Sequence, residues 1–317
     1  MLILFIILFI LSCIILVKTS DWVIYALVGI AKAFGWSEFF ITFCLMAAAT
    51  SLPELFVGIT SALNRQSQLS FGNIIGANVI NLTLIAGLAA VVGGSLALNK
   101  IAGKRDAFWT GLFAFLPTFL ILDGSLSRVD GTILLVIAVI YSSYFLKGRT
   151  KAASILSAKI ERSILQVKVL LKDIAIFIIG LIVLLLSAHG IVWSSTVLAE
   201  SIGVPVFLIG ILIVAVGTTL PEMVFGLRAI MLNHKDMVLG NLMGSVIINS
   251  TLVLGITCII YPVSIVKFSP YIIGIIFTIV SVSLFYIFAR TRESISKKEG
   301  IALIIIYCIF IASQVLI

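Results

Sequence analysis

The sequence contains little charge, little histidine and little cysteine. Only 11% of its residues are charged, and it has two histidines and four cysteines. The cysteines lie singly within apolar runs, without the C-x-x-C spacing of a zinc site or the pattern of a disulfide framework: Cys13, Cys44, Cys258 and Cys308. His189 and His234 lie near the ends of apolar runs, where water-exposed side chains are expected. A metal centre built from sulfur and imidazole is therefore not expected.

Apolar residues are what the sequence has in excess. Of its 317 residues 62% are hydrophobic, and the mean hydropathy is +1.29, which no water-soluble globular domain of this length shows. Because one membrane crossing needs about 20 apolar residues, ten crossings use roughly 200 residues and leave no room for a sizeable soluble domain. The composition therefore predicts a multi-pass protein of the cell membrane that contacts the lipid bilayer.

Runs free of Asp, Glu, Lys and Arg predict an all-α protein with ten membrane-spanning helices. They cover approximately residues 1–17, 39–63, 70–95, 107–122, 131–146, 174–194, 205–227, 238–262, 268–289 and 300–317. Two further apolar segments, Trp22–Gly35 and Ile191–Gly203, are too short to cross alone, so each either extends the preceding helix or lies at the membrane interface. The first run, Met1–Val17, lacks the basic start and the A-x-A site of a signal peptide and is expected to remain as the first helix.

The distribution of basic residues predicts the orientation of the chain. With ten crossings, 18 of the 21 Lys and Arg residues fall on one side, and the other side has only Arg65, Arg128 and Lys267. By the positive-inside rule the richer side is cytoplasmic, so both termini are predicted to be extracytoplasmic. The net charge of +8 is explained by this topology, and no nucleic-acid partner is expected.

An internal repeat is the most informative pattern in the sequence. The segment Ala49–Glu54 reads A-T-S-L-P-E and recurs as G-T-T-L-P-E at Gly217–Glu222. The separation between Glu54 and Glu222, called the repeat offset below, pairs further residues without a gap: Gly58 with Gly226, Gly72-Asn73 with Gly240-Asn241, Gly76 with Gly244, Asn81 with Asn249, and Gly87 with Gly255. This register indicates that the two halves of the chain share one fold.

The two copies of the motif fall in the second and seventh expected spans. Since five crossings separate them and five is odd, the halves must have opposite orientations in the membrane. We therefore expect two inverted five-helix repeats, residues 1–150 (motif about 40–90) and 171–317 (motif about 208–258), joined by a basic cytoplasmic connection, residues 151–170. Inverted repeats with a binding site between them are typical of secondary transporters.

Two acidic residues, Glu54 and Glu222, lie in the middle of expected spans, whereas the other eleven lie in connections or near span ends. A carboxylate at mid-bilayer costs roughly 3 kcal/mol, so it persists only when it is paired, protonated or bound to a cation. No Lys or Arg lies at a matching depth in any expected span. Protons or metal ions are therefore the expected partners of these two carboxylates.

Oxygen-bearing groups accompany each glutamate. Pro53 and Pro221 lack an N–H for the carbonyl four residues earlier, which frees backbone oxygens beside the carboxylate. Neighbouring hydroxyl and amide groups complete the set: Thr50, Ser51, Thr218, Thr219, Asn81 and Asn249. Carboxylate, amide, hydroxyl and carbonyl oxygens favour hard cations such as Ca²⁺.

At these residues the sequence resembles the cation/calcium exchanger superfamily, and especially its prokaryotic sodium/calcium exchanger branch. The resemblance covers essentially the whole chain and includes the repeated T-[ST]-L-P-E motif and Ser20-Asp21-Trp22 after the first span. It implies ten helices in two inverted halves, four ion sites midway through the membrane, and alternating access by sliding of the first and sixth helices. It further implies that sodium entry drives calcium export.

The resemblance also implies a set of site residues. The calcium-type site would comprise Glu54, Asn81, Glu222 and Asn249, with the carbonyls of Thr50 and Thr218 nearby, and the flanking sodium ligands would be Ala47, Ser51, Ala215, Thr219 and Ser245. Two positions depart from the family pattern: Asn249 stands where Asp is typical, and Ala77 where Ser is typical. They remove one ionisable group and one hydroxyl ligand.

The expected function is therefore that of an antiporter, without a cofactor and without enzymatic activity, which exchanges Ca²⁺ for Na⁺ by alternating access. A Ca²⁺/H⁺ antiporter, with Glu54 and Glu222 alternating between cation and proton, is the alternative. A passive channel and an intramembrane enzyme are less favoured, because the chain has no obvious pore motif, and because no nucleophile with a base accompanies the carboxylates. The sequence leaves open the coupling ion, the stoichiometry and the oligomeric state.

Overall fold

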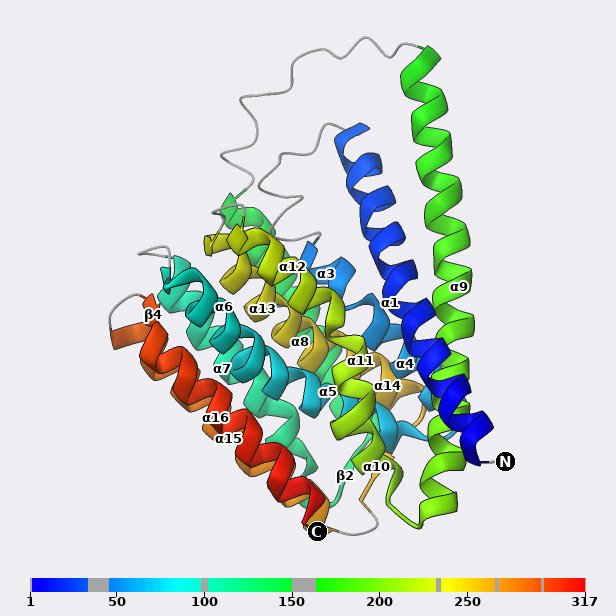
Figure 1. The fold of residues 1–317 in the computed structure, drawn as a ribbon, viewed down its shortest axis with the longest axis vertical. Helices are drawn as coiled ribbons and strands as arrows, with labels where there is room; N and C mark the ends of the chain where they lie inside the picture. Colours follow the sequence, from blue (N-terminus) through cyan, green and yellow to red (C-terminus); the bar gives the residue numbers. More distant parts are fainter. Residues whose placement is uncertain are drawn as a thin grey trace.

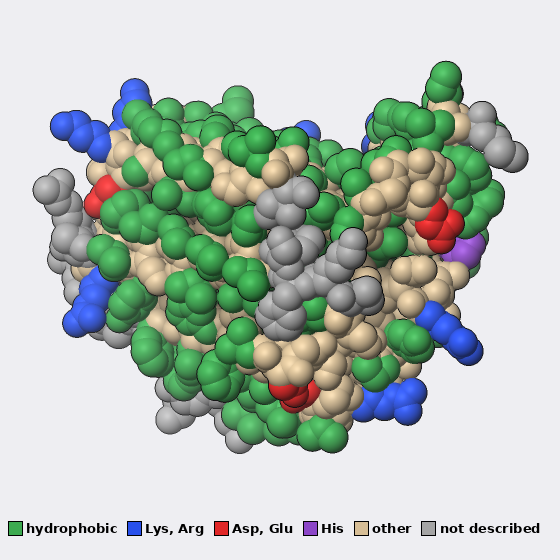
Figure 2. All heavy atoms as spheres, turned by 90° about the horizontal axis from the view of Figure 1, so that it is seen from below, with side chains coloured by type: hydrophobic (Ala, Val, Ile, Leu, Met, Phe, Trp, Pro, Cys, Tyr) green, Lys and Arg blue, Asp and Glu red, His purple; other side chains and the backbone are tan. Residues whose placement is uncertain are grey.

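The computed structural model of the chain describes residues 2–33, 46–97, 102–149, 164–231, 235–265, 268–291 and 294–316. The start of the second expected span, residues 39–45, and most of the expected basic connection, residues 151–163, lie outside the described residues. The described residues form a helical bundle, with two long helices along one flank and both chain ends toward the same end of the molecule (Figure 1). Apolar side chains dominate the view onto that end, and the charged side chains are few and scattered (Figure 2).

The long flanking helices are α1 (Leu2–Ala33) and α9 (Ile164–Ile202), which pack against each other. They approach closely because Gly180 and Gly190 of α9 leave room for Val23 and Ser12 of α1, which a β-carbon at either glycine would overlap. Ser12 lies opposite Gly190 and Val23 lies opposite Gly180, so the two helices are antiparallel. The apolar segments beginning at Trp22 and Ile191 continue the preceding helices. Of the two expected alternatives, extension of the helix is therefore confirmed.

Three elements of the first half have the same bounds as their counterparts in the second half. The first half contains α3 (Met46–Thr50), α4 (Leu52–Leu63), α5 (Ser67–Ile80), the π-helical turn η2 (Asn81–Ile85) and α6 (Ala86–Gly93). The second contains α10 (Val206–Ile209), the π-helical turn η5 (Gly210–Val214), α11 (Ala215–Thr218), α12 (Leu220–Met231), α13 (Lys235–Ile248), the π-helical turn η6 (Asn249–Val253) and α14 (Leu254–Ile260). The repeat offset superposes the bounds of α4 on α12, α5 on α13 and η2 on η6. The repeat found in the sequence is thus also a repeat of local structure.

The remaining elements cover the bundle and connect the halves. They are α7 (Ala102–Leu120), the short 3₁₀ turn η3 (Ile121–Asp123), α8 (Arg128–Arg149), α15 (Phe268–Thr291), α16 (Lys297–Val315) and four short strands, β1 (Ser95–Ala97), β2 (Ser125–Leu126), β3 (Val263–Ser264) and β4 (Ser294–Ser296). β1 pairs antiparallel with β4, with Ser95 opposite Ser296, and β2 with β3, with Ser125 opposite Ser264. Each pair therefore joins the first half to the second.

Small residues bring α5 against the start of the seventh span. A β-carbon on Gly72 would overlap the Phe207 carbonyl oxygen, and one on Gly76 would overlap that of Ile211. Gly72 lies opposite Phe207 and Gly76 lies opposite Ile211, so residue numbers increase in the same direction in both segments. The helix α5 and the segment 206–214 are therefore parallel. α5 itself folds back on α4 after a tight turn at Arg65, where φ is 60°. The seventh span therefore begins in the direction opposite to α4, in agreement with the expected inversion of the two halves.

Eight helices within the described ranges are long and apolar enough to cross a membrane, so the chain is a multi-pass membrane protein. They correspond to expected spans 1, 3, 4 and 6–10. α3 and α4 lie within the expected second span, and α8 lies over the fifth. The count of ten crossings stays a prediction.

Candidate cation-binding site

The helices of both repeats break immediately before the Leu-Pro-Glu motif. Ser51, between α3 and α4, has φ −81° and ψ 2°, and Thr219, between α11 and α12, has φ −85° and ψ 0°. Pro53 and Pro221 occupy the second helical position after each break, where a missing N–H is tolerated. The break therefore places each glutamate in the first turn of a new helix, near backbone groups that the regular helix would have used.

Glu54 and Glu222 come from different halves and meet inside the protein. Both are fully buried, and their carboxyl groups are close enough to repel each other when both are charged. None of their four carboxyl oxygens has a hydrogen-bond partner within the described part of the chain. Two buried carboxylates without partners are costly in an apolar interior unless protons or metal ions neutralise them.

The first threonine of each motif copy lies near the glutamate of the other half. The Thr218 hydroxyl lies near the Glu54 carboxyl group, and the hydroxyls of Thr50 and Ser245 lie near that of Glu222. Each of these hydroxyls also has a partner in the other half: Thr218 donates to Oδ1 of Asn73 (2.9 Å), and the Thr50 and Ser245 oxygens lie 3.2 Å apart.

Asn81 and Asn249 are the first residues of the π-helical turns η2 and η6. Both side chains are fully buried, and neither amide oxygen nor amide nitrogen has a partner among the described residues. A π-helical turn changes the direction of the following side chains and often occurs at functional sites. The sequence predicted these two asparagines as ligands but did not predict the π-helical turns that hold them.

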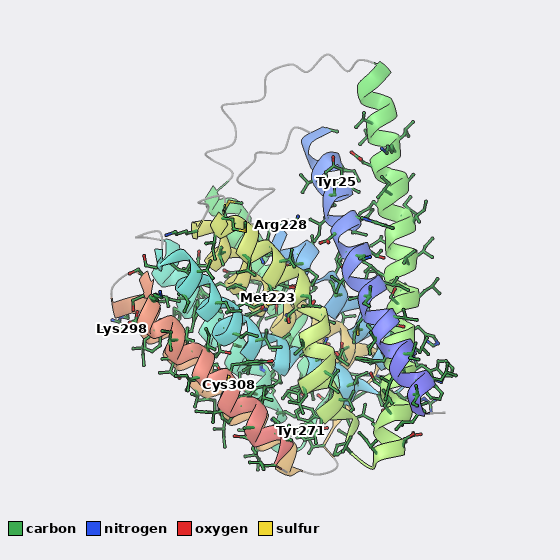
Figure 3. The ribbon with its side chains drawn as sticks, in the orientation of Figure 1. Tyr25, Met223, Arg228, Tyr271, Lys298 and Cys308 are labelled. Atoms are coloured by element: carbon green, nitrogen blue, oxygen red, sulfur yellow. The ribbon has the colours of Figure 1, made fainter. Side chains whose placement is uncertain are left out.

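The other predicted ligands are buried as well. Ser51 has a hydroxyl without a partner in the described structure, whereas Thr219 donates to the Ala215 carbonyl at 2.8 Å. Ala47 and Ala215 are 2% and 0% exposed. The Ala215 carbonyl also accepts the Thr219 N–H at 3.1 Å, and the Ala47 carbonyl accepts the Ser51 N–H at 3.3 Å. Figure 3 labels Met223, the neighbour of Glu222, midway along the bundle, and Arg228 farther along the same helix, on the side toward Tyr25.

Asn73 and Asn241 were missed as functional candidates. In the sequence they belong to the repeated Gly-Asn pair, which indicated only the repeat and no role in the site. In the structure Asn73 accepts a hydrogen bond from Thr218, and Asn241 accepts one from Thr50 at 3.4 Å. The available signal was the repetition of a buried polar residue at the same offset as the glutamates.

The donor set of this site fits a hard cation. No group of three or more His, Cys, Asp and Glu side chains that could hold a metal ion occurs in the described ranges, so a cation here would be held by two carboxylates and by neutral oxygens. Each buried polar atom without a partner costs about 1–3 kcal/mol, and a Ca²⁺ or Na⁺ ion coordinated by these oxygens would remove that cost.

Comparisons with known proteins agree with this geometry. The chain is 29% identical over 261 residues to the inner membrane protein YrbG of Escherichia coli, covering 80% of this chain and 79% of that protein. It is 28% identical over 337 aligned residues to the sodium/calcium exchanger MaX1 of Methanosarcina acetivorans, covering 95% of both chains. It is 32% identical to an uncharacterized membrane protein of Methanocaldococcus jannaschii over 307 residues, or 96% of each chain.

Solved structures of the sodium-calcium exchanger NCX_Mj share the fold. One, soaked with 2.5 mM Na⁺ and 10 mM Sr²⁺, has a TM-score of 0.68 at 28% identity, and another, with 10 mM Na⁺ and zero Ca²⁺, has 0.65 at 29%; both alignments cover 99% of each chain. The sequence also matches the family described as sodium/calcium exchanger protein over residues 4–147 and 172–316. This match spans both halves and includes every residue of the candidate site, so the chain belongs to the sodium/calcium exchanger protein family.

Proposed function

We propose that this protein is a secondary active antiporter that exchanges Ca²⁺ for Na⁺ across the membrane by alternating access. The observation that carries the proposal is the meeting of Glu54 and Glu222, two fully buried carboxyl groups without hydrogen-bond partners in the described structure, one from each half. Their combined charge of −2 matches one Ca²⁺ or two Na⁺, so either cargo neutralises the site. The names of NCX_Mj and MaX1 add support.

The proposed ligands follow from the donor atoms. Ca²⁺ binds Glu54, Glu222, Asn81 and Asn249, whose side-chain oxygens have no other partner in the described structure. The carbonyls of Thr50 and Thr218 lie beside them. Sodium ions bind on the flanks, at the remaining members of the predicted set: Ala47, Ser51, Ala215, Thr219 and Ser245. Because Asn249 has no charge, it acts here as a neutral ligand.

Alternating access requires two halves that can present one site to either side. In our proposal ten crossings form two inverted halves, residues 1–150 and 171–317, with the connection 151–170 in the cytoplasm and both termini outside. The matching bounds of α4 and α12, and the opposite directions of α4 and the start of the seventh span, support this arrangement.

The test is transport by the purified protein in liposomes. Uptake of radioactive Ca²⁺ is measured with an outward Na⁺ gradient, with an outward proton gradient, and with neither, at clamped voltage. We expect uptake only with the Na⁺ gradient. Uptake driven by protons alone would replace the proposal by Ca²⁺/H⁺ exchange, and equal flux without any gradient would indicate a channel.

A further inference from the structure

A hydrogen bond between an asparagine and a threonine joins the halves twice at the site. Thr218 of α11 donates to Oδ1 of Asn73 in α5 at 2.9 Å, and Thr50 of α3 donates to Oδ1 of Asn241 in α13 at 3.4 Å. All four side chains are at most 1% exposed. Because the repeat offset separates Asn73 from Asn241 and also Thr50 from Thr218, the two bonds are equivalent contacts between the halves.

Each of the two hydrogen bonds holds the end of a helix at the point where the helix breaks. Thr50 is the last residue of α3 and Thr218 the last of α11, so each bond fixes the helix end just before the Leu-Pro-Glu motif. A threonine hydroxyl has one proton to donate. Since Thr218 donates its proton to Asn73, its hydroxyl oxygen is held in place beside Glu54.

The two contacts differ in strength because the repeat is imperfect. Thr50 also lies 3.2 Å from the hydroxyl of Ser245, which stays in reach if Asn241 is lost. The position equivalent to Ser245 in the first half is Ala77, which has no hydroxyl. Thr218 therefore has no neighbouring hydroxyl at that position to replace Asn73 if Asn73 is lost.

We propose that Asn73 and Asn241 are positioning residues that hold Thr218 and Thr50 in the geometry needed for cation binding, and that only the Asn73 contact is indispensable. The inference rests on the proposed function, because it assigns these residues a role in binding the same cargo. It adds two residues that touch the threonines of the site and are not themselves ligands.

The first measurement is Ca²⁺ binding at equilibrium, read from the Ca²⁺-dependent rise in melting temperature of the detergent-solubilised protein without Na⁺. Loss of one buried hydrogen bond corresponds to a change in Kd of about tenfold, which we expect for Asn73→Ala. Asn241→Ala alone should change the Kd by less than about threefold, and Asn241→Ala with Ser245→Ala should reach the full effect.

Two further variants separate positioning from general destabilisation. Ala77→Ser supplies the hydroxyl that the first half lacks and should restore most of the Ca²⁺ affinity of Asn73→Ala. Thr218→Val keeps the backbone carbonyl and removes the hydroxyl, so combining it with Asn73→Ala should cost no more than either change alone. The matched control is Ser70→Ala, which removes another buried cross-half contact, Ser70 with Thr257 at 3.1 Å, and should lower the melting temperature without changing the Kd.

The outcomes distinguish this inference from the proposed function. Wild-type protein with neither Ca²⁺-dependent stabilisation nor Na⁺-driven uptake would overturn the proposed function. If the wild type shows both, two results would overturn the inference alone. One is an Asn73→Ala variant with a lower melting temperature but an unchanged Kd for Ca²⁺, as expected of Ser70→Ala. The other is an effect on the Kd in the double variant Asn73→Ala with Thr218→Val that equals the sum of the two single effects. The inference is supported if Asn73→Ala weakens Ca²⁺ binding about tenfold and Ala77→Ser restores it.

Discussion

The hydroxyl oxygens of Thr50 and Ser245 lie 3.2 Å apart across the interface between the two halves. The equivalent pair, Thr218 and Ala77, has no such contact because alanine lacks the hydroxyl. One side of the site therefore has an oxygen donor that the other side lacks. This asymmetry within a repeated site motivates several of the experiments below.

Glu54→Gln or Glu222→Gln should reduce Ca²⁺ uptake about 10- to 150-fold while the protein still folds. Each change removes one of two charges that neutralise the cargo, and a charge-assisted contact is worth about 1.5–3 kcal/mol. Uptake into liposomes and the elution profile of the purified protein are the two measurements. Retained Ca²⁺ transport in both variants would refute the site. Glu200→Gln, on the exposed end of α9, is the charge-matched control and should transport normally.

Asn249→Asp should change the electrical charge moved in each transport cycle. The substitution adds an ionisable group at the start of η6, where neither amide atom has a partner in the described residues. If the new carboxyl group ionises, it requires one more positive charge when the site is loaded. The current that accompanies Na⁺-driven uptake, divided by the Ca²⁺ flux, gives this charge. An unchanged ratio would mean that the aspartate stays neutral and acts as the asparagine does.

Ala77→Ser should raise the apparent affinity for Na⁺ several-fold. The substitution introduces a hydroxyl at the position equivalent to Ser245, which lies near Glu222, and a buried hydroxyl ligand is worth about 1 kcal/mol. The measurement is the Na⁺ concentration that half-saturates Ca²⁺ efflux from loaded liposomes. Ala77→Cys, of similar size but with a soft donor, is the control. A Na⁺ affinity equal in wild type and Ala77→Ser would remove this position from the sodium sites.

Gly72→Ala should destabilise the folded protein by about 1–3 kcal/mol. A β-carbon there would overlap the backbone oxygen of Phe207, and α5 would have to move away from the start of the seventh span. Thermal unfolding in detergent measures the loss. Gly93→Ala is the matched control, because its β-carbon would meet Ile230 at an ordinary 3.4 Å, so its melting temperature should be unchanged or higher. Equal effects of the two would contradict the tight packing at Gly72.

Much of the architecture could be predicted because the chemistry of the bilayer limits it. Apolar runs gave eight of the helices, since only a helix satisfies its own backbone groups in lipid, and the repeat offset matched the helix bounds of the two halves. The helix break at Leu-Pro-Glu followed from the missing N–H of Pro53 and Pro221. The interpretation of Trp22–Gly35 remained open until the structure showed α1 continuing to Ala33, because its length alone fits both alternatives.

The site was predicted less completely than the fold. The candidates at Glu54, Glu222, Asn81 and Asn249 were found because polar groups are rare and costly in apolar spans. The π-helical turns at Asn81 and Asn249 were not predicted, since no residue pattern in those segments distinguishes them from a regular helix. Asn73 and Asn241 were missed as well, because a buried asparagine gains its role from the threonine opposite, which is 145 or 191 residues away.

The sequence by itself determined that this chain lies in a membrane, that its halves repeat, and that two carboxyl groups are placed where they need protons or metal ions, because each of these follows from local composition and spacing. Only the tertiary structure decided which groups share one site. Glu54 lies near Thr218 and Glu222 near Thr50 because close packing at glycines interleaves the two halves. Proximity across the interface between the halves depends on how the helices pack, which spacing along one chain does not specify.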